Sequence, residues 1–242
     1  MSKIISIINH NSKSGKTIIS FNLSCALSLV GKKTLYLTYK SNFEFEKLTK
    51  NRIVKKLKFE KLEKFSCSGF ETILPDLDVL VLDNSFYDVE EDKDSVFFLK
   101  KYLKFNYNYI ICDSQSTLLS SFDFFTAISD EYIIPIETDP SSFDSLAPMF
   151  AKIEWIKEEN NGKPVFSGFL LNKVFKDSKL SDLFKKHAFF LFQRHVLDCV
   201  IPFSDLINLK INPSGCILDD VMDKSFVCFI DLAKLIIKGE NS

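Results

Sequence analysis

Residues 10–17 read His10-Asn11-Ser12-Lys13-Ser14-Gly15-Lys16-Thr17, and they lie between an apolar run at 4–8 and a helical pattern that begins at Lys16. The order strand, turn, helix is that of a loop that binds phosphate, because the backbone N–H groups of the turn and the positive end of the helix both face the anion. In such a loop the lysine reaches the outer phosphates and the hydroxyl binds Mg²⁺. The stretch therefore predicts a nucleotide site at the start of the first helix.

This loop departs from the pattern G-x-x-x-x-G-K-[ST] at its first position, where His10 replaces glycine. Ser12, Lys13 and Ser14 occupy positions where small or flexible residues are usual. Because glycine permits positive φ and a close approach of the backbone, its loss restricts the conformations of the loop. We still expect the loop to hold a nucleotide.

The composition is that of an ordinary globular protein. Of the 242 residues, 46% are hydrophobic and 26% are charged, and the net charge of −1 produces no field that would draw the chain to nucleic acid or membrane. No run of 18 apolar residues occurs, so we expect no transmembrane segment. The six cysteines form no C-x-x-C pair, which favours reduced thiols and a cytoplasmic protein.

Short apolar runs alternate with helical patterns along the chain. The expected strands are 3–9, 34–39, 78–83, 107–113, 131–136, 165–172 and 197–201. The expected helices are 16–31, 43–64, 93–105, 117–129, 141–159, 178–193 and 223–238. This alternation predicts an α/β fold, with one domain over residues 1–242 and a mostly parallel twisted sheet covered by helices on both faces.

A candidate partner for the loop follows the fourth expected strand. Asp113 ends the buried run Tyr109-Ile110-Ile111-Cys112. Since the carboxyl ends of parallel strands meet at one edge of a sheet, we expect this carboxylate to lie beside the Thr17 hydroxyl and to hold Mg²⁺ through water.

Several short motifs, in the right order, resemble those of the ParA/MinD family of deviant-Walker P-loop ATPases. The family loop K-G-G-x-G-K-T-T aligns with Asn11–Ile18, and its helix N-L-A-x-A-L-A followed by G-K-x-V-L is similar to Asn22–Leu35. The family strand A-A-D-E-V-I-I-P-V resembles Ile128–Ile136. The later motifs G-x-x-x-N and V-x-x-x-I-P resemble Gly168–Asn172 and Val196–Pro202. The similarity covers nearly the whole chain, in a degenerate form.

This resemblance implies a P-loop NTPase fold that binds ATP or ADP with Mg²⁺ and forms a homodimer. The residues implied to bind the nucleotide are Lys13, Ser14, Gly15, Lys16, Thr17, Ile18, Asn172 and Pro202. Among them, Asn172 would lie near the adenine and Pro202 close to the base pocket. The family pattern also places magnesium between Thr17 and Asp113.

Two departures from the family pattern concern hydrolysis. The lysine that crosses the family's dimer interface is replaced by Asn11, with Lys13 two residues away. The D-x-D pair that positions the attacking water is replaced by Thr38-Tyr39-Lys40. Because phosphoryl transfer depends on positioning and on charge placement, we predict no catalytic residue and a hydrolysis that is very slow or lost.

Three functions stay open at this point. The first is a partitioning or positioning protein for a plasmid, a chromosome region, or a division or flagellar apparatus, which acts by nucleotide-linked dimerisation. The second is a nucleotide-free pseudo-ATPase scaffold that binds a protein partner. The third, and least favoured, is an ATP-dependent enzyme of the dethiobiotin-synthetase or cobyrinate-synthase type.

One charged block has two interpretations. Residues Lys47–Lys64 contain eight basic residues against Glu60 and Glu63. Such a block is either a solvated helix face or a patch that contacts DNA phosphates without sequence preference.

Overall fold

The first strand, β1 (Lys3–Ile7), precedes the loop at residues 10–17, and the first helix, α1 (Lys16–Leu29), begins at its end. In the computed structural model, the residues described are 2–11, 13–39, 53–57, 67–72, 74–82, 93–114, 120–143, 146–204 and 224–239. α1 ends as expected from the sequence, since Gly31 has φ +77° just beyond it and Lys32 N–H donates to the Leu27 carbonyl.

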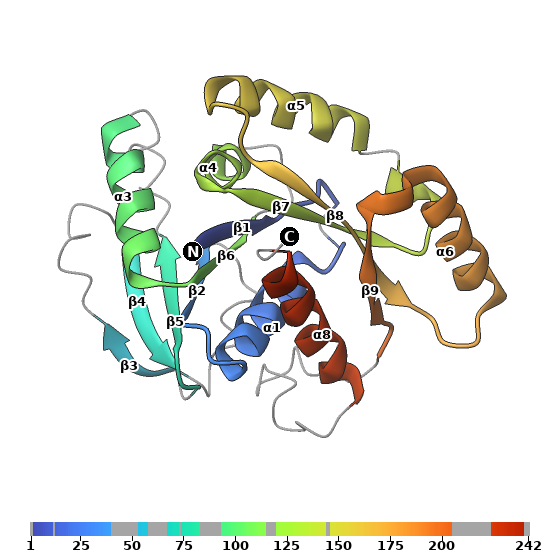
Figure 1. Cartoon of the computed structure of the whole chain (residues 1–242), viewed down its shortest axis with the longest axis horizontal. Helices are drawn as coiled ribbons and strands as arrows, with labels where there is room; N and C mark the ends of the chain where they lie inside the picture. The colour runs from blue at the N-terminus through green and yellow to red at the C-terminus, as the bar shows by residue number, and fades with distance from the viewer. Residues whose placement is uncertain are drawn as a thin grey trace.

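Figure 1 shows the remaining elements: in the described ranges four strands come first, and helices then alternate with strands to the end. The other strands are β2 (Thr34–Tyr39), β3 (Ile53–Leu57), β4 (Cys67–Thr72), β5 (Leu77–Leu82), β6 (Tyr109–Asp113), β7 (Glu131–Glu137), β8 (Val165–Val174) and β9 (Val196–Pro202). The other helices are α3 (Lys93–Asn106), α4 (Ser120–Ile128), α5 (Leu146–Glu159), α6 (Lys179–Phe192) and α8 (Lys224–Lys238), with 3-10 turns η3 (Pro140–Phe143) and η4 (Gln193–His195).

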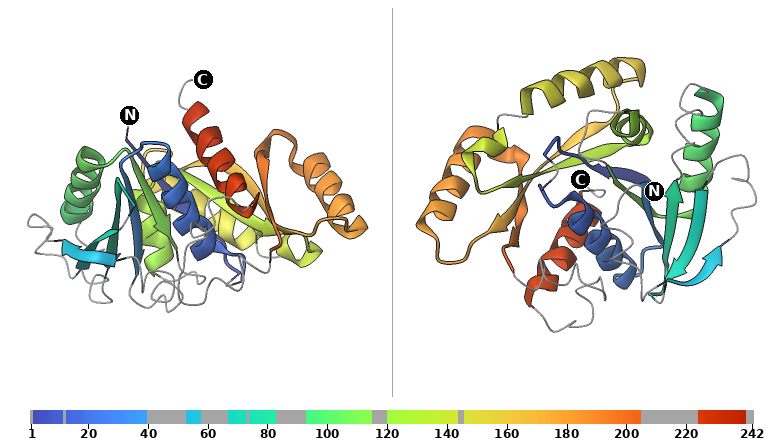
Figure 2. Two further views of the ribbon diagram at one scale, coloured as in Figure 1. Left: turned by 90° about the horizontal axis from the view of Figure 1, so that it is seen from below. Right: turned by 180° about the vertical axis from the view of Figure 1, so that it is seen from behind.

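The nine strands that the structure describes form one sheet in the order β3-β4-β5-β2-β6-β1-β7-β8-β9. Every pairing from β5 to β9 is parallel, whereas β4 pairs antiparallel with both β3 and β5. A parallel sheet needs cover on both faces. α1 and α8 cover one face, and α3, α4 and α5 lie over the other (Figures 1 and 2). This arrangement confirms the predicted fold class.

The alternation of side chains along β1 explains the two layers. Ile5 and Ile7 pack into the cluster that α1 and α8 complete, and Ile4 packs on the opposite face with Phe125 of α4. Ser6 shares that second face, where its hydroxyl donates to the Phe125 carbonyl. Since β1 is flanked by β6 and β7, its carboxyl end delivers the loop to the middle of the sheet.

Two helix predictions need correction. The helix predicted over 43–64 is wrong at Ile53–Leu57, which form β3 and pair with β4. The rest of that range, and with it most of the basic block Lys47–Lys64, lies outside the described residues, as does Lys40. The helix predicted over 141–159 is divided into η3 and α5. Among the helices that the structure describes, none is long and apolar enough to cross a membrane.

Candidate nucleotide-binding site

Gly15 is the N-cap of α1 and has φ +84°, a left-handed conformation that glycine adopts without penalty. A Cβ at this position would collide with the Asn172 amide nitrogen, which donates to the Ser14 carbonyl at 2.8 Å. Gly15 is therefore required both by its backbone conformation and by the close approach of β8. α1 begins directly after the loop, so the backbone N–H groups of the loop lie at the positive end of the helix.

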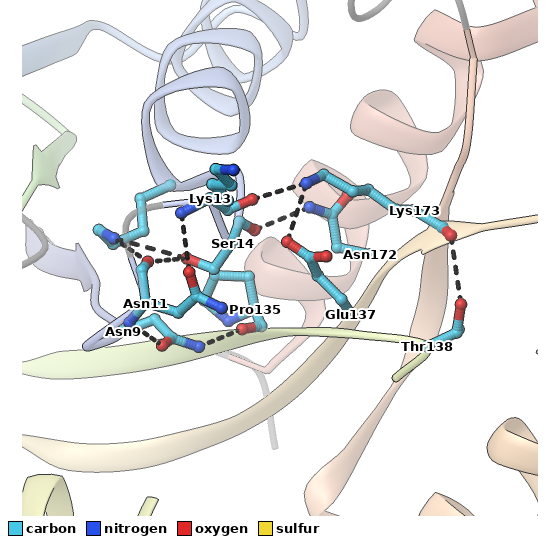
Figure 3. Close-up of polar contacts among 10 residues, drawn as sticks. Asn9, Asn11, Lys13, Ser14, Pro135, Glu137, Thr138, Asn172 and Lys173 are labelled. Carbon is cyan, nitrogen blue, oxygen red and sulfur yellow. Dashed lines mark hydrogen bonds and ion pairs between the residues drawn. The ribbon is translucent and has the colours of Figure 1, made fainter. Parts of the chain in front are cut away.

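Two asparagines order the first half of the loop, where glycine is missing. The Asn9 amide donates to the Pro135 carbonyl of β7 at 2.6 Å, and its oxygen accepts from Asn11 N–H at 2.8 Å (Figure 3). The Asn11 side chain accepts in turn from Lys13 N–H at 2.9 Å. A hydrogen bond from a backbone N–H to a side chain two residues earlier stabilises a tight turn. The two asparagines therefore restrict the conformation of a loop that lacks its first glycine.

Lys16 is 4% exposed, and its side chain crosses the loop, so that its ammonium lies near the first half of the loop. It donates to the Asn11 carbonyl at 2.8 Å and lies 3.5 Å from the Ser14 hydroxyl. A buried ammonium needs such oxygen partners to offset desolvation. Phosphate oxygens would satisfy the same donors, so the position of Lys16 suits an anion in the loop.

The Thr17 hydroxyl donates to Asp113 Oδ1 at 3.1 Å, which joins α1 to the end of β6 as the sequence predicts. The other carboxylate oxygen accepts from the Tyr36 hydroxyl at 2.8 Å and from the Thr38 hydroxyl at 3.4 Å. Burial raises the pKa of Asp113 to about 6, while the hydrogen bonds from Tyr36 and Thr17 and the charge of Lys16 act in the opposite direction. Burial, together with the Asp113 charge, holds the pKa of Tyr36 well above its usual value.

This donor set fits Mg²⁺. A hydroxyl and a carboxylate oxygen are hard ligands, and magnesium typically takes one or two protein oxygens and completes its shell with phosphate and water. In the described ranges, no group of three or more His, Cys, Asp or Glu is placed to hold a metal by itself. Thr17 and Asp113 would therefore hold the ion together with the phosphates of a nucleotide.

A hollow opens beside the loop, at the carboxyl ends of β8 and β9. It is lined by Gly15, Ile18, Asn172, Lys173, Pro202, Phe203 and Ser204. Asn172 and Pro202, which are expected near the nucleobase, thus line the same hollow as Gly15 and Ile18. The Phe203 ring stacks on Phe175 at a centroid distance of 4.3 Å. The face of a nucleobase can pack against an apolar, partly aromatic wall of this kind, but the hollow itself, with a free volume of about 10 Å³, does not enclose a base.

The predicted site residues are therefore gathered at one edge of the sheet, although their binding roles stay predictions. Lys13 is exposed on the loop, and its carbonyl accepts from Lys173. Sequence reasoning missed Tyr36 and Lys173. No local signal marks Tyr36 as a partner of Asp113, because only the β2–β6 pairing brings them together. Lys173 could have been noticed only as the cation that follows Asn172.

Comparisons with known proteins bear on the family and the fold of this chain. A family model described as an AAA domain, of the ParA/MinD type, matches residues 2–164. An uncharacterized protein of Methanocaldococcus jannaschii is 28% identical over 196 residues, which cover 73% of this chain and 75% of that protein.

Two solved structures share the fold. The septum site-determining protein MinD of Pyrococcus horikoshii, complexed with Mg-ADP, superposes with a TM-score of 0.75 at 21% identity, over 98% of this chain and 96% of that one. Cobyrinic acid a,c-diamide synthase of Mycobacterium smegmatis, with a bound ATP analogue and magnesium, gives 0.76 at 12% identity, over 100% and 96%.

At these identities the two structural likenesses establish the fold alone. The family model goes further, because it matches more than half of the 242 residues, including the loop and Asp113. The chain belongs to the ParA/MinD family of P-loop ATPases.

Proposed function

We propose that this chain is a ParA/MinD-like protein that binds ATP or ADP with Mg²⁺ and partitions or positions a cargo within the cytoplasm. The cargo would be a plasmid, a chromosome region, or a division or flagellar apparatus. The observation that carries the proposal is the Thr17–Asp113 pair, 3.1 Å apart, beside the buried ammonium of Lys16. The fold of the septum site-determining protein MinD with Mg-ADP supports it.

Each part of the site has a distinct task in this proposal. Lys16 exchanges its bond to the Asn11 carbonyl for a phosphate oxygen, and the N–H groups at the start of α1 face the same anion. Thr17 and Asp113 hold Mg²⁺, which neutralises phosphate charge when it is bound. Asn172 and Pro202 border the hollow, and the base would lie against this lining.

Weak hydrolysis follows from the residues at the end of β2. Thr38 stands at the first position of the family's carboxylate pair, and its hydroxyl donates to Asp113. A hydroxyl does not accept a proton from water at neutral pH, so the attacking water loses its expected positioning carboxylate. We expect phosphate release slower than about one per minute. A faster release that Lys16→Ala abolishes would contradict this part of the proposal.

In this proposal the protein acts by forming a dimer whose stability depends on the bound nucleotide. Sedimentation velocity should show a homodimer with Mg-ATP and a monomer with Mg-ADP or without nucleotide. Lys16→Ala should stay monomeric under all three conditions, because its phosphate contact is lost. A wild-type chain that dimerises to the same extent without nucleotide would contradict the proposal.

A pseudo-ATPase scaffold that binds a protein partner is the second candidate. One observation favours it, since Lys16 and Asp113 already have protein partners at the distances given above. If the chain is such a scaffold, titration of Mg-ATP into the protein should produce no heat of binding. The fold shared with cobyrinic acid a,c-diamide synthase supports an ATP-dependent enzyme only at the level of architecture.

Contact between Lys47–Lys64 and DNA is a separate proposal about partners. Eight basic residues there would contact phosphates, and binding would weaken steeply with salt. An anisotropy titration with labelled duplex DNA at two salt concentrations tests it. Binding that is absent at low salt would leave the block as a solvated surface.

A further inference from the structure

We propose that Lys173 is a positioning residue for the phosphate loop and that Glu137 orients it. This inference rests on the nucleotide-binding function proposed above. The Lys173 ammonium donates to the Lys13 carbonyl at 2.7 Å and to Glu137 Oε1 at 2.8 Å (Figure 3). Together with the bond from Asn172 to the Ser14 carbonyl, it joins the end of β8 to two consecutive carbonyls of the loop.

The backbone of Lys173 makes this double attachment possible. In a regular strand, successive side chains point to opposite faces of the sheet. Leu170 packs in the cluster of α1 and α8, and Leu171 packs on the face of α5, so alternation would send Asn172 to the loop and Lys173 away from it. Lys173 instead has φ +52°, and its side chain reaches the loop beside Asn172.

A left-handed conformation at a lysine is rare and is maintained only where the surroundings enforce it. Two contacts do so here. The Thr138 hydroxyl donates to the Lys173 carbonyl at 3.3 Å, and Glu137, on the neighbouring strand β7, binds the ammonium. The Lys173 and Glu137 side chains are 28% and 23% exposed, so the pair is partly shielded from water. Such an enforced conformation beside a binding loop points to a role in that loop.

The attachment has a direct consequence for anion binding. In a planar trans peptide, the carbonyl and the following N–H point in opposite directions. When Asn172 holds the Ser14 carbonyl toward β8, the Gly15 N–H points away from β8. Lys173 holds the preceding carbonyl in the same way. Both peptide units are thus fixed before an anion arrives, in a loop that lacks its first glycine.

Lys173→Met tests the proposal, because it keeps the length of the side chain and removes its donors. We expect the Kd of Mg-ADP and the Kd of pyrophosphate each to rise about tenfold, as befits the loss of a hydrogen bond from a charged donor. Lys173→Arg retains donors and should recover most of the affinity. The matched control is Lys185→Met, which removes the Lys185–Asp182 pair (3.7 Å) on the surface of α6; the Lys185 side chain is exposed to a similar extent (30%), and both Kd values should be unchanged.

A second variant separates positioning from charge. Lys173→Met leaves the Glu137 carboxylate without its cation near the phosphates, and repulsion alone would weaken binding. In Lys173→Met/Glu137→Gln this repulsion is removed. If Lys173 acts through the Lys13 carbonyl, the double variant stays about as weak as Lys173→Met. Recovery of wild-type affinity would overturn the positioning role.

Hydrogen exchange of the nucleotide-free protein gives a readout that does not depend on binding. Lys173→Met should raise the exchange rate of peptides that span residues 11–16, with little change in β1 or in the thermal midpoint. An unchanged exchange rate in the loop would overturn the inference even if affinity falls. If the wild-type chain binds neither Mg-ADP nor pyrophosphate, the proposed function fails, and the exchange experiment still decides the role of Lys173 in the loop.

Discussion

The Thr17 hydroxyl lies 3.1 Å from Asp113 Oδ1 and donates a hydrogen bond to it, although 96 residues separate the two in sequence. One comes from the first turn of α1 and the other from the last residue of β6. β1 and β6 are adjacent and parallel, so the loop after β1 and the end of β6 meet at one edge of the sheet. The proposed site for a magnesium nucleotide rests on this pairing.

Asp113→Asn should reduce the dependence of nucleotide binding on magnesium. The amide fills the same space but is a poorer ligand for Mg²⁺ than a carboxylate. Calorimetric titration of ADP into wild type should give tighter binding with Mg²⁺ than with EDTA, and the ratio of these two Kd values should be smaller in the variant. A magnesium effect of undiminished size in the variant would remove Asp113 from the site.

The same carboxylate predicts a pH dependence of folding in metal-free, nucleotide-free protein. Burial raises the pKa of Asp113 from 3.8 to about 6, so between these values the folded chain holds a proton that the unfolded chain releases. The contribution of this group to stability is therefore largest below about pH 4 and is lost as pH rises toward 6. Urea unfolding of wild type and Asp113→Asn in EDTA measures it as the difference between the two. A difference that stays constant from pH 4 to 6 would contradict the prediction.

Gly15→Ala should cost more stability than Gly31→Ala. Both glycines have positive φ, so alanine costs about 1 kcal/mol at either position for its conformation. At Gly31 a new Cβ meets nothing within 4 Å, whereas at Gly15 it collides with the Asn172 amide. We expect a further 1–3 kcal/mol at Gly15, roughly the cost of overpacking. If urea unfolding gives the two variants equal losses of unfolding free energy, the Asn172 side chain moves aside from the new Cβ without cost.

Asp130, at the amino-terminal edge of the sheet, should stabilise the fold without affecting nucleotide binding. Its side chain is 8% exposed and binds Lys104 (2.8 Å), Lys163 (3.0 Å) and the Ile4 N–H (3.0 Å). Burial alone would raise the pKa of this carboxyl, but these hydrogen bonds lower it below its usual value. Its stabilisation is thus present above about pH 4 and is lost as pH falls further.

Asp130→Ala should lose about 2–3 kcal/mol of unfolding free energy at pH 7, because the substitution removes a mostly buried carboxylate and leaves its donors without that acceptor. Glu154→Ala, which removes an exposed pair with Lys157, is the matched control and should change it by less than about 0.5 kcal/mol. A loss for Asp130→Ala no larger than that of the control would show that the cluster contributes little. Unchanged Mg-ADP affinity in both variants separates stability from function.

The phosphate loop and its carboxylate could be predicted from sequence because their signals are local. Gly15-Lys16-Thr17 stands between a strand pattern and a helix pattern, and Asp113 ends an uninterrupted apolar run. The topology rule for parallel sheets then places them together. Asn172 and Pro202 needed the family resemblance, since nothing in their neighbourhood marks a base pocket.

The misassigned segment shows where local patterns fail. Ile53, Val54 and Leu57 have a spacing that fits one face of a helix, and the lysines between them favour a helix as well. Their strand conformation depends on pairing with β4, which lies in a different part of the sequence. Strand stability comes largely from such cross-strand neighbours, which a local pattern does not contain.

Lys173 illustrates a different limit. Its position beside Asn172 is visible in the sequence, but the strand expected there ends at residue 172, and continued alternation would point Lys173 away from the loop. One left-handed φ angle, enforced by Glu137 and Thr138, reverses that direction. Such a backbone outlier depends on tertiary contacts and is visible only in the structure.

The most direct test of the central claim is calorimetric titration of Mg-ATP into the wild-type chain and into Lys16→Ala. If the loop holds a nucleotide, the wild type gives a saturable heat with one site per chain, and the variant gives none at the same concentrations. Absence of heat in a folded wild-type chain at millimolar Mg-ATP, or equal binding by both proteins, would contradict a nucleotide site built on Lys16.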